Sequence, residues 1–217
     1  MVLISGFLGC SRKPAQDEYL IRVGSQSISV AEFNQAVDMV GEESSAGENN
    51  LNAKDIYEIK VRVLNQLTEE LIILEKAKAM GLSVTETEID QAVQQIKADY
   101  PDNTFEETLL ENAISYKIWR QKLASRLLIE KVIAKELVDQ VTISAEDIAD
   151  YYQKHYPEGT PEDAPAEDVN KRIVRHLRKQ KAEQNYKAWI EKLRGVYSVE
   201  LNRQQWERLI NENSETD

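Results

Sequence analysis

Apolar residues recur at intervals of three and four along most of the chain, the spacing that places side chains on one face of an α-helix. The clearest run begins near Asn52 and ends at Gly81, a residue type that favours the position just after a helix. Its apolar positions are Ile56, Ile59, Val63, Leu67, Leu71 and Leu74. Leu64, Ile72 and Ile73 widen this face, so we expect this helix at the centre of the core.

Helix starts are marked at four places by Ser or Thr followed three residues later by an acidic residue, the pattern of a capping box. These starts are Ser29, Thr85, Thr104 and Ser144. We expect the first helix to end near Val40, before a loop over Gly41–Asn50, and two further long helices over about Ile114–Val138 and Ala166–Arg194.

Short β-like runs occur near both ends of the chain. Tyr19–Val23 and Gln26–Ile28 flank Gly24-Ser25 and predict a hairpin. Val196–Leu201 is also strand-like, and we expect it to pair with Leu20–Val23. The predicted fold class is therefore mainly α, a multi-helix module with a minor two- or three-stranded antiparallel sheet that joins the N- and C-terminal segments.

Composition narrows the chemistry. The chain has 217 residues, of which only eight are Gly and five are Pro, and this low content favours long helices over a turn-rich β fold. Its net charge of −11 argues against a general nucleic-acid binder, because such proteins carry an excess of basic residues. One Cys excludes an internal disulfide and a Cys-cluster zinc site. His155 and His176 have no local His or Cys neighbour, and no phosphate-binding loop or nucleophile elbow occurs. We expect no catalytic residue, metal or cofactor.

The first residues predict lipidation. Met1–Gly9 is apolar or small throughout and ends at Cys10, and Phe7–Cys10 resembles a bacterial lipobox. The polar residues that follow suit a tether, and acyl chains on Cys10 would anchor the protein to a membrane. No Lys or Arg precedes the apolar run, so either the true start lies upstream or the signal is degenerate. The alternative is an unmodified Cys behind a hydrophobic N-terminus.

Two oppositely charged segments adjoin each other late in the chain. Pro157–Asp168 holds three Pro and five acids and predicts an exposed linker. Lys171–Lys181 carries basic residues and no acid, which indicates either an anionic partner or a solvated helix face beside the acidic linker. The interspersed Ile173, Val174 and Leu177 favour the helix face.

The order of elements resembles the SurA/PrsA family of chaperones. The most specific segment is Leu64–Asp90, a Leu- and Ile-rich helix end followed by Met-Gly-Leu-Ser and an acidic capping box. Val141–Ser144 leading into Tyr151-Tyr152 is the second match. The resemblance implies a proline-isomerase (parvulin) domain after Tyr152, but Pro157–Asp168 is too short to hold one, so no enzyme activity is expected.

This resemblance implies an ATP-independent holdase of the periplasm or cell envelope. Its partners would be unfolded or partly folded exported proteins, with no nucleic acid, and an apolar groove would bind them. The expected peptide-binding residues are Tyr57, Tyr116, Trp119, Tyr151, Tyr152 and Trp189, with core packing as the alternative for each. The other hypothesis is a structural or adaptor lipoprotein with one fixed partner.

The expected division of the chain follows from the same resemblance. It comprises a signal and tether (1–18), a helical chaperone domain (19–156), an acidic linker (157–168), a helix and strand that complete the core (169–202), and a short helix with an acidic tail (203–217).

Overall fold

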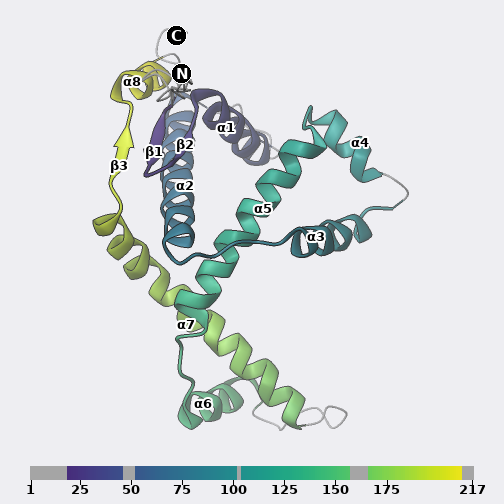
Figure 1. The fold of residues 1–217 in the computed structure, drawn as a ribbon. Helices are drawn as coiled ribbons and strands as arrows, with labels where there is room; N and C mark the ends of the chain where they lie inside the picture. The colour runs from purple at the N-terminus through teal and green to yellow at the C-terminus, as the bar shows by residue number, and fades with distance from the viewer. Residues whose placement is uncertain (1–18, 46–51, 102–103, 157–165, 212–217) are drawn as a thin grey trace, which may run out of the picture. The chain divides into compact units, whose positions relative to one another are not determined.

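The computed structural model describes residues 19–45, 52–101, 104–156 and 166–211. The predicted lipidation site, Cys10, the predicted signal and tether, and most of the predicted linker lie outside these residues. The elements in chain order (Figure 1) are β1 (Ile21–Val23), β2 (Gln26–Ile28), α1 (Val30–Ser45), α2 (Ala53–Ala79), α3 (Glu86–Ala98), α4 (Thr104–Glu111), α5 (Tyr116–Ile133), η1 (Ala134–Val138), α6 (Ala145–His155), α7 (Ala166–Val196), β3 (Val199–Leu201) and α8 (Arg203–Asn211).

The chain forms two compact units, and the boundary between them falls within α2. Among the described residues, unit 1 comprises 19–45, 52–68 and 199–211, and unit 2 comprises 69–101, 104–156 and 166–198. The mainly helical fold class with a small sheet is confirmed.

Unit 1 contains a three-stranded antiparallel sheet of order β2-β1-β3. Gly24 has φ 57°, a left-handed conformation that glycine adopts at little cost, and the chain turns there between β1 and β2. In the central strand, Ile21 pairs with Ile28 on one side and with Leu201 on the other. The predicted pairing of the two chain ends is confirmed, although the last strand begins at Val199 because α7 continues to Val196.

The core of unit 1 is built from residues near both ends of the sequence. Leu20, Ile21, Val23 and Phe33 are fully buried. The Phe33 ring meets the Trp206 ring of α8 edge-on, with 6.0 Å between centroids. The ammonium group of the buried Lys60 donates a hydrogen bond to the carbonyl of Leu209, which satisfies a backbone acceptor near the end of α8.

Local capping signals set most helix boundaries. The capping boxes at Ser29, Thr85 and Ser144 are confirmed. The box at Thr104 is wrong: Thr104 is itself helical and its hydroxyl donates to the carbonyl of Pro101. The predicted helix end at Val40 and the predicted loop over Gly41–Asn50 are wrong for residues 41–45, which continue α1 to Ser45. A single glycine such as Gly41 costs only about 1 kcal/mol inside a helix and does not end it.

The end of α2 in unit 2 follows the sequence expectation. Leu71, Ile72, Ile73 and Ala77 are buried. Gly81 has φ 63°, and the amide of Leu82 donates to the carbonyl of Ala77, which closes the helix. The chain then leads into α3, which packs on α5 around Ile89, Val93 and Leu123.

The predicted helix over Ile114–Val138 changes its hydrogen bonding near its end. Ser115 caps α5, and the last five residues form a π-helical turn, η1, in which the amide of Asp139 donates to the carbonyl of Ala134. Hydrogen bonds between residues five apart bring Val132 and Leu137 toward one side, and both are buried.

Helix α7 changes its buried face along its length. Val169, Ile173 and Leu177 pack against α6 in the first half, which lies beside that helix (Figure 1). Ala182, Ile190 and Leu193 are buried in the second half. At 3.6 residues per turn, Leu177 and Tyr186 lie about 180° apart around the helix axis. The first half therefore packs on one side of α7 and the second half on the other.

Candidate functional site: an apolar groove and two aromatic clusters

A groove of about 570 Å³ lies in unit 2 between the end of α5, η1 and the middle of α7. Apolar side chains form its floor, and charged side chains stand at its edge. Its lining residues are Glu130, Ile133, Ala134, Leu137, Val138, Arg175, Lys179, Ala182, Glu183 and Tyr186. A volume of this size accommodates several side chains of a bound molecule.

Two local features produce the groove. The π-helical turn directs Leu137 and Val138 toward α7, which contacts η1 directly. The face change of α7 begins at Ala182, whose small side chain leaves space that a larger residue would fill. If η1 and α7 each presented a uniform apolar face to the other, their side chains would interdigitate and fill the groove.

Tyr186 is held in place at one end of the groove. Its hydroxyl donates a hydrogen bond to the Glu69 carboxylate over 3.2 Å, and Arg194 pairs with the same carboxylate at 3.2 Å. Burial, together with the negative charge of Glu69, raises the pKa of Tyr186 to about 12. The phenol therefore remains neutral at physiological pH, with its ring exposed to the groove.

The predicted residue Trp189 lies behind this tyrosine rather than in the groove lining. Its ring centroid is 5.7 Å from that of Tyr186. Its indole N–H is buried and has no hydrogen-bond partner among the described residues. Trp189 therefore supports the position of Tyr186 and leaves one buried donor unused.

Charged residues at the edge of the groove are unequally paired. Glu130 pairs with Arg126 at 2.9 Å, and Lys179 approaches Glu183 at 4.0 Å. Arg175 is exposed and has no ion-pair partner among the described residues. The lining holds two acids, Glu130 and Glu183, and two bases, Arg175 and Lys179, so the unpaired positive charge is local to Arg175.

Tyr116 and Trp119 form an aromatic cluster at the start of α5. Their rings stack with 5.8 Å between centroids, and Trp119 also meets the buried Phe105 of α4 edge-on at 4.8 Å. The ammonium group of Lys97 lies over the Phe105 and Tyr116 rings. Exposed large apolar side chains nearby in the sequence are Leu110 on α4, Tyr116 and Ile118 on α5, and Tyr100 in the bend after α3.

Tyr151 and Tyr152 belong to a second aromatic cluster, between α6 and the first half of α7. Both are half-buried and pack against Val169, Ile173 and Leu177. His155 stacks on the Tyr151 ring at 4.2 Å, and His176 meets the same ring at 5.5 Å. These contacts support a packing role, and they bring together two histidines that are far apart in the sequence.

The expected binding residues fall in both units and, within unit 2, in separate aromatic groups. Tyr57 is exposed on α2 in unit 1, whereas the others lie in unit 2. Among the described residues, no ring contact joins the Tyr116 cluster, the Tyr151 cluster and Trp189 to one another. Their role in peptide binding stays a prediction.

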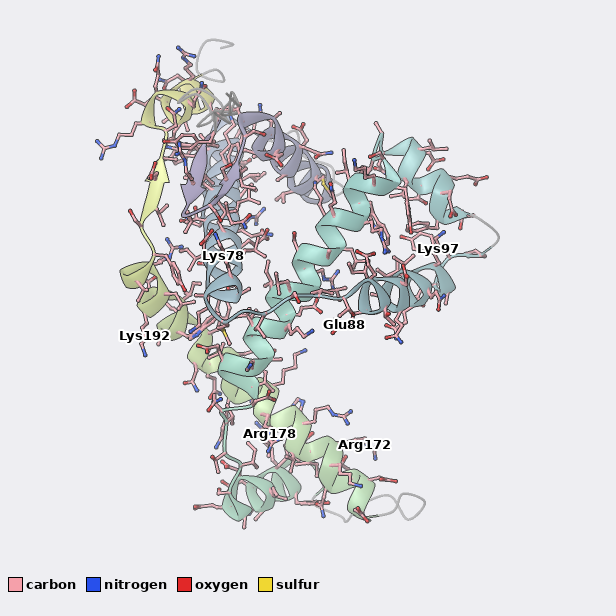
Figure 2. All side chains as sticks on the ribbon, viewed as in Figure 1. Lys78, Glu88, Lys97, Arg172, Arg178 and Lys192 are labelled. Atoms are coloured by element: carbon pink, nitrogen blue, oxygen red, sulfur yellow. The ribbon has the colours of Figure 1, made fainter. Side chains whose placement is uncertain are left out.

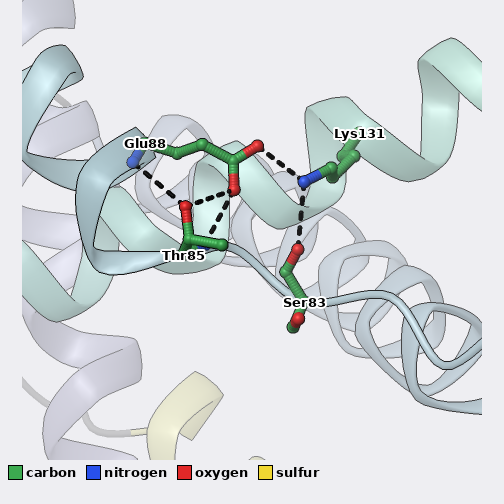
Figure 3. A network of polar contacts seen from close by, with 4 residues as sticks. All are labelled: Ser83, Thr85, Glu88 and Lys131. Carbon is green, nitrogen blue, oxygen red and sulfur yellow. Dashed lines mark hydrogen bonds and ion pairs between the residues drawn. The ribbon is translucent and has the colours of Figure 1, made fainter.

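A polar network holds α3 against α5 (Figure 3). Thr85 and Glu88 form the capping box of α3, and Lys131 donates to Glu88 at 2.6 Å and to the carbonyl of Ser83 at 3.1 Å. The Lys131 ammonium, together with the Thr85 donors, lowers the pKa of Glu88 to about 2. Glu88 and Lys131 of this network also line a more polar hollow of about 400 Å³.

Sequence reasoning did not identify the groove residues. One available signal was the spacing of Leu127, Val132 and Leu137, which is five rather than three or four. A second was the interruption of the apolar stripe between Leu177 and Ala182. Both are points where an ideal α-helical pattern fails, and the groove lies where they meet.

Within the described ranges, no helix has the length and apolar character needed to cross a bilayer. The same ranges contain no cluster of three or more His, Cys, Asp or Glu side chains arranged to hold a metal ion.

Comparison with known proteins identifies the family. The model of the SurA-like N-terminal domain matches residues 1–133, more than half of the chain. The chain belongs to the SurA-like N-terminal domain family. This confirms the resemblance found in the sequence as far as the end of α5, one wall of the groove, whereas the second matching segment, Val141–Tyr152, lies beyond the matched residues.

Named relatives of this SurA-like chain include chaperones and foldases. It is 24% identical over 151 residues to "Chaperone SurA" of Legionella pneumophila strain Paris, a match that covers 69% of this chain and 35% of that protein. It is 22% identical over 161 residues to "Foldase protein PrsA" of Caldanaerobacter subterraneus subsp. tengcongensis, covering 68% of this chain and 47% of that protein. The chain thus spans about a third to a half of these relatives.

Proposed function

We propose that this protein is an ATP-independent holdase that binds unfolded or outer-membrane-bound polypeptides outside the cytoplasm. The observation that carries the proposal is the apolar groove between η1 and α7 in a chain of the SurA-like N-terminal domain family. Apolar floors with a charged edge are suited to side chains that an unfolded protein exposes.

The proposed groove needs no reactive group. Ile133, Leu137, Val138 and Ala182 provide apolar surface, and Tyr186 adds an aromatic ring with a fixed polar end. Affinity would come from the burial of client apolar surface, at roughly 25 cal/mol per Å² before the cost of ordering the client. Without nucleotide, release depends on modest affinity and fast dissociation.

The exposed cluster around Tyr116 is a second contact surface in this proposal. Tyr116, Ile118 and Leu110 are each at least 43% exposed, a large fraction for such apolar side chains. Scattered contacts of this kind extend the length of client held without fixing its sequence. The proposal also includes Trp119, Tyr57, Tyr151, Tyr152 and Trp189 as residues that contact clients.

The proposed setting is the periplasm or cell envelope, with lipid on Cys10 as the anchor. Support comes from the lipobox-like Phe7–Cys10 and from the family. The proposal includes no proline-isomerase activity, because only residues 156–165 separate α6 from α7, the place where the resemblance implies that domain. It also includes the domain division in which residues 169–202 complete the core of residues 19–156, in keeping with the pairing of β3 with β1.

Suppression of client aggregation tests the proposal. Light scattering of a chemically denatured client diluted into buffer is followed with and without equimolar protein. Ala134→Trp places a bulky side chain in the groove from an exposed position, and we expect it to abolish most of the protection. The matched control is Ala188→Trp, which makes the same change at an exposed position of α7 outside the groove lining.

Two results would count against the holdase. Absence of suppression by the unaltered protein would reject it, and equal loss in both Trp variants would reject the groove as its site. A single stoichiometric partner in pull-downs, without protection of generic clients, would instead support an adaptor lipoprotein.

A further inference from the structure

The basic run on α7 divides into paired lysines and unpaired arginines. Lys171 pairs with Glu167 at 2.8 Å, Lys179 lies 4.0 Å from Glu183, and Lys181 pairs with Asp147 at 2.7 Å. Three arginines in the same stretch have no partner among the described residues: Arg172, Arg175 and Arg178. Arg172 and Arg178 lie on this half of the helix in Figure 2. The chain as a whole is strongly acidic, so this is a local reversal of charge.

The unpaired charge continues the line of the groove. At 3.6 residues per turn, Arg175 lies within about 20° of both Ala182 and Tyr186 around the helix axis, and Lys179 lies on the same side. Arg175 and Lys179 are themselves lining residues. The side of α7 that is apolar in its second half therefore carries Arg175 and Lys179 next to the groove, with Asp168 two turns closer to the start of the helix.

We infer that the groove selects segments of unfolded polypeptide in which apolar side chains adjoin one or more carboxylates. This inference rests on the proposed function and specifies its client. The apolar side chains occupy the floor formed by Leu137, Val138 and Ala182, and the carboxylate lies at the Arg175 end. A guanidinium group binds carboxylates in a fork geometry, and an Arg without a competing acid is free to do so.

A polypeptide fits this juxtaposition better than an anionic membrane. A flat layer of lipid head groups would meet the arginines but would leave the adjoining cavity of about 570 Å³ unused. A client segment places apolar and acidic groups at the spacing of a few residues, which matches the distance from Tyr186 to Arg175 along one helix.

Peptide binding measured by fluorescence anisotropy tests the inference. Three labelled peptides share one apolar core and carry three Asp, three Lys or three Ser residues at each end. We expect the Asp-flanked peptide to bind about fivefold more tightly than the Ser-flanked one, the scale of a few exposed ion pairs. Salt at about 1 M, where the Debye length is about 3 Å, should remove the difference.

Charge reversal at one position provides the control. Arg175→Glu should reverse the preference toward the Lys-flanked peptide. Lys192→Glu makes the same charge change at an exposed position of α7, about 25 Å away along the helix, and should leave the preference unchanged. Far-UV circular dichroism verifies that both variants remain helical.

Several outcomes would overturn the inference. Equal binding of the three peptides, or an Asp preference that survives Arg175→Glu, rejects it while leaving the holdase intact if the Ser-flanked peptide still binds. Binding of none of the three peptides rejects the proposed function at this groove as well. Arg175-dependent sedimentation with phosphatidylglycerol vesicles, or Arg175-dependent dimerisation, in the absence of a peptide preference would assign the arginines to a membrane or to a second copy.

Discussion

The two halves of α7 belong to one continuous helix but pack on opposite sides. The first half presents Val169, Ile173 and Leu177 to α6 and is tied to it by the Lys181–Asp147 ion pair. The second half buries Ile190 and Leu193 and is tied to α2 through Glu69. The contrast shows that a helix can serve two cores, and that the point where it changes face is where a groove can stay open.

The largest expected loss of stability comes from a substitution in the core of the second half of α7. Ile190 is 2% exposed, so Ile190→Ala leaves a cavity that neighbouring side chains cannot refill. We expect the free energy of unfolding to fall by about 2–5 kcal/mol in urea denaturation. Val196→Ala, at the exposed end of the same helix, should change it by less than about 0.5 kcal/mol. Similar losses in the two variants would contradict the assignment of Ile190 to a core.

A smaller loss is expected in the first half. Leu177→Ala removes a contact with α6, a helix without any buried residue of its own. The cost should lie near the low end for Leu→Ala, about 2 kcal/mol, and should open α6 locally. Hydrogen exchange measures this: amides of α6 should lose protection while those of α7 beyond Ala182 keep theirs. Uniform loss along α7 would mean that the halves are not separate.

The cap of α6 sharpens the same comparison. The Ser144 hydroxyl accepts from the amide of Asp147, so Ser144→Ala leaves that amide without its partner. We expect a loss of about 1 kcal/mol, read as a lower Tm. Thr142→Ala, at an exposed position just before the cap, should leave the Tm nearly unchanged. Equal Tm values for the two variants would show that the cap contributes nothing.

The two halves should also differ in their response to pH. Lys181, together with Ser144, lowers the pKa of Asp147 from 3.8 to about 2. The ionised Asp147 therefore stabilises the folded state fully above pH 4, and this stabilisation is lost as pH falls through 2. Burial raises the pKa of Tyr186 from 10.0 to about 12. The protonated Tyr186 therefore stabilises the folded state below pH 10, and this stabilisation is lost as pH rises through 12.

Variants separate these two responses. Lys181→Met should make stability fall less steeply as pH decreases, since Asp147 loses its largest stabilising partner while Glu88, whose pKa is also about 2, keeps its own. Tyr186→Phe should make stability fall less steeply as pH rises from 10 to 12. Thermal unfolding followed by circular dichroism over a pH series provides the measurement. If Lys181→Met keeps the wild-type loss of stability at low pH, Asp147 does not stabilise the first half of α7 through Lys181. If Tyr186→Phe keeps the wild-type loss at high pH, the Tyr186 hydroxyl does not stabilise the second half.

The sequence predicted best where structure depends on local chemistry. The capping boxes at Thr85 and Ser144, the helix end at Gly81 and the hairpin around Gly24 each follow from a few adjacent residues. Thr104 misled because its pattern matched a capping box, whereas the helix starts at that residue and its hydroxyl bonds backward to Pro101.

The groove was less accessible to the same reasoning. Its floor depends on how η1 and α7 approach each other, which no local pattern determines. The aromatic residues chosen from the sequence are large enough to pack, and Tyr151 and Trp189 contact neighbouring rings. The open surface arises instead from small residues such as Ala134 and Ala182, which have no polar or aromatic group that would indicate a binding role in the sequence.

The central strand β1 pairs with β2, which is synthesised directly after it, and with β3, which is synthesised much later. Its neighbour β2 follows after a two-residue turn, but β3 ends only at Leu201. Unit 2 is continuous in sequence, so its helices can associate during synthesis while the sheet of unit 1 waits for a third strand. Until the ribosome has released that strand, one edge of β1 remains a template for pairing with any extended chain.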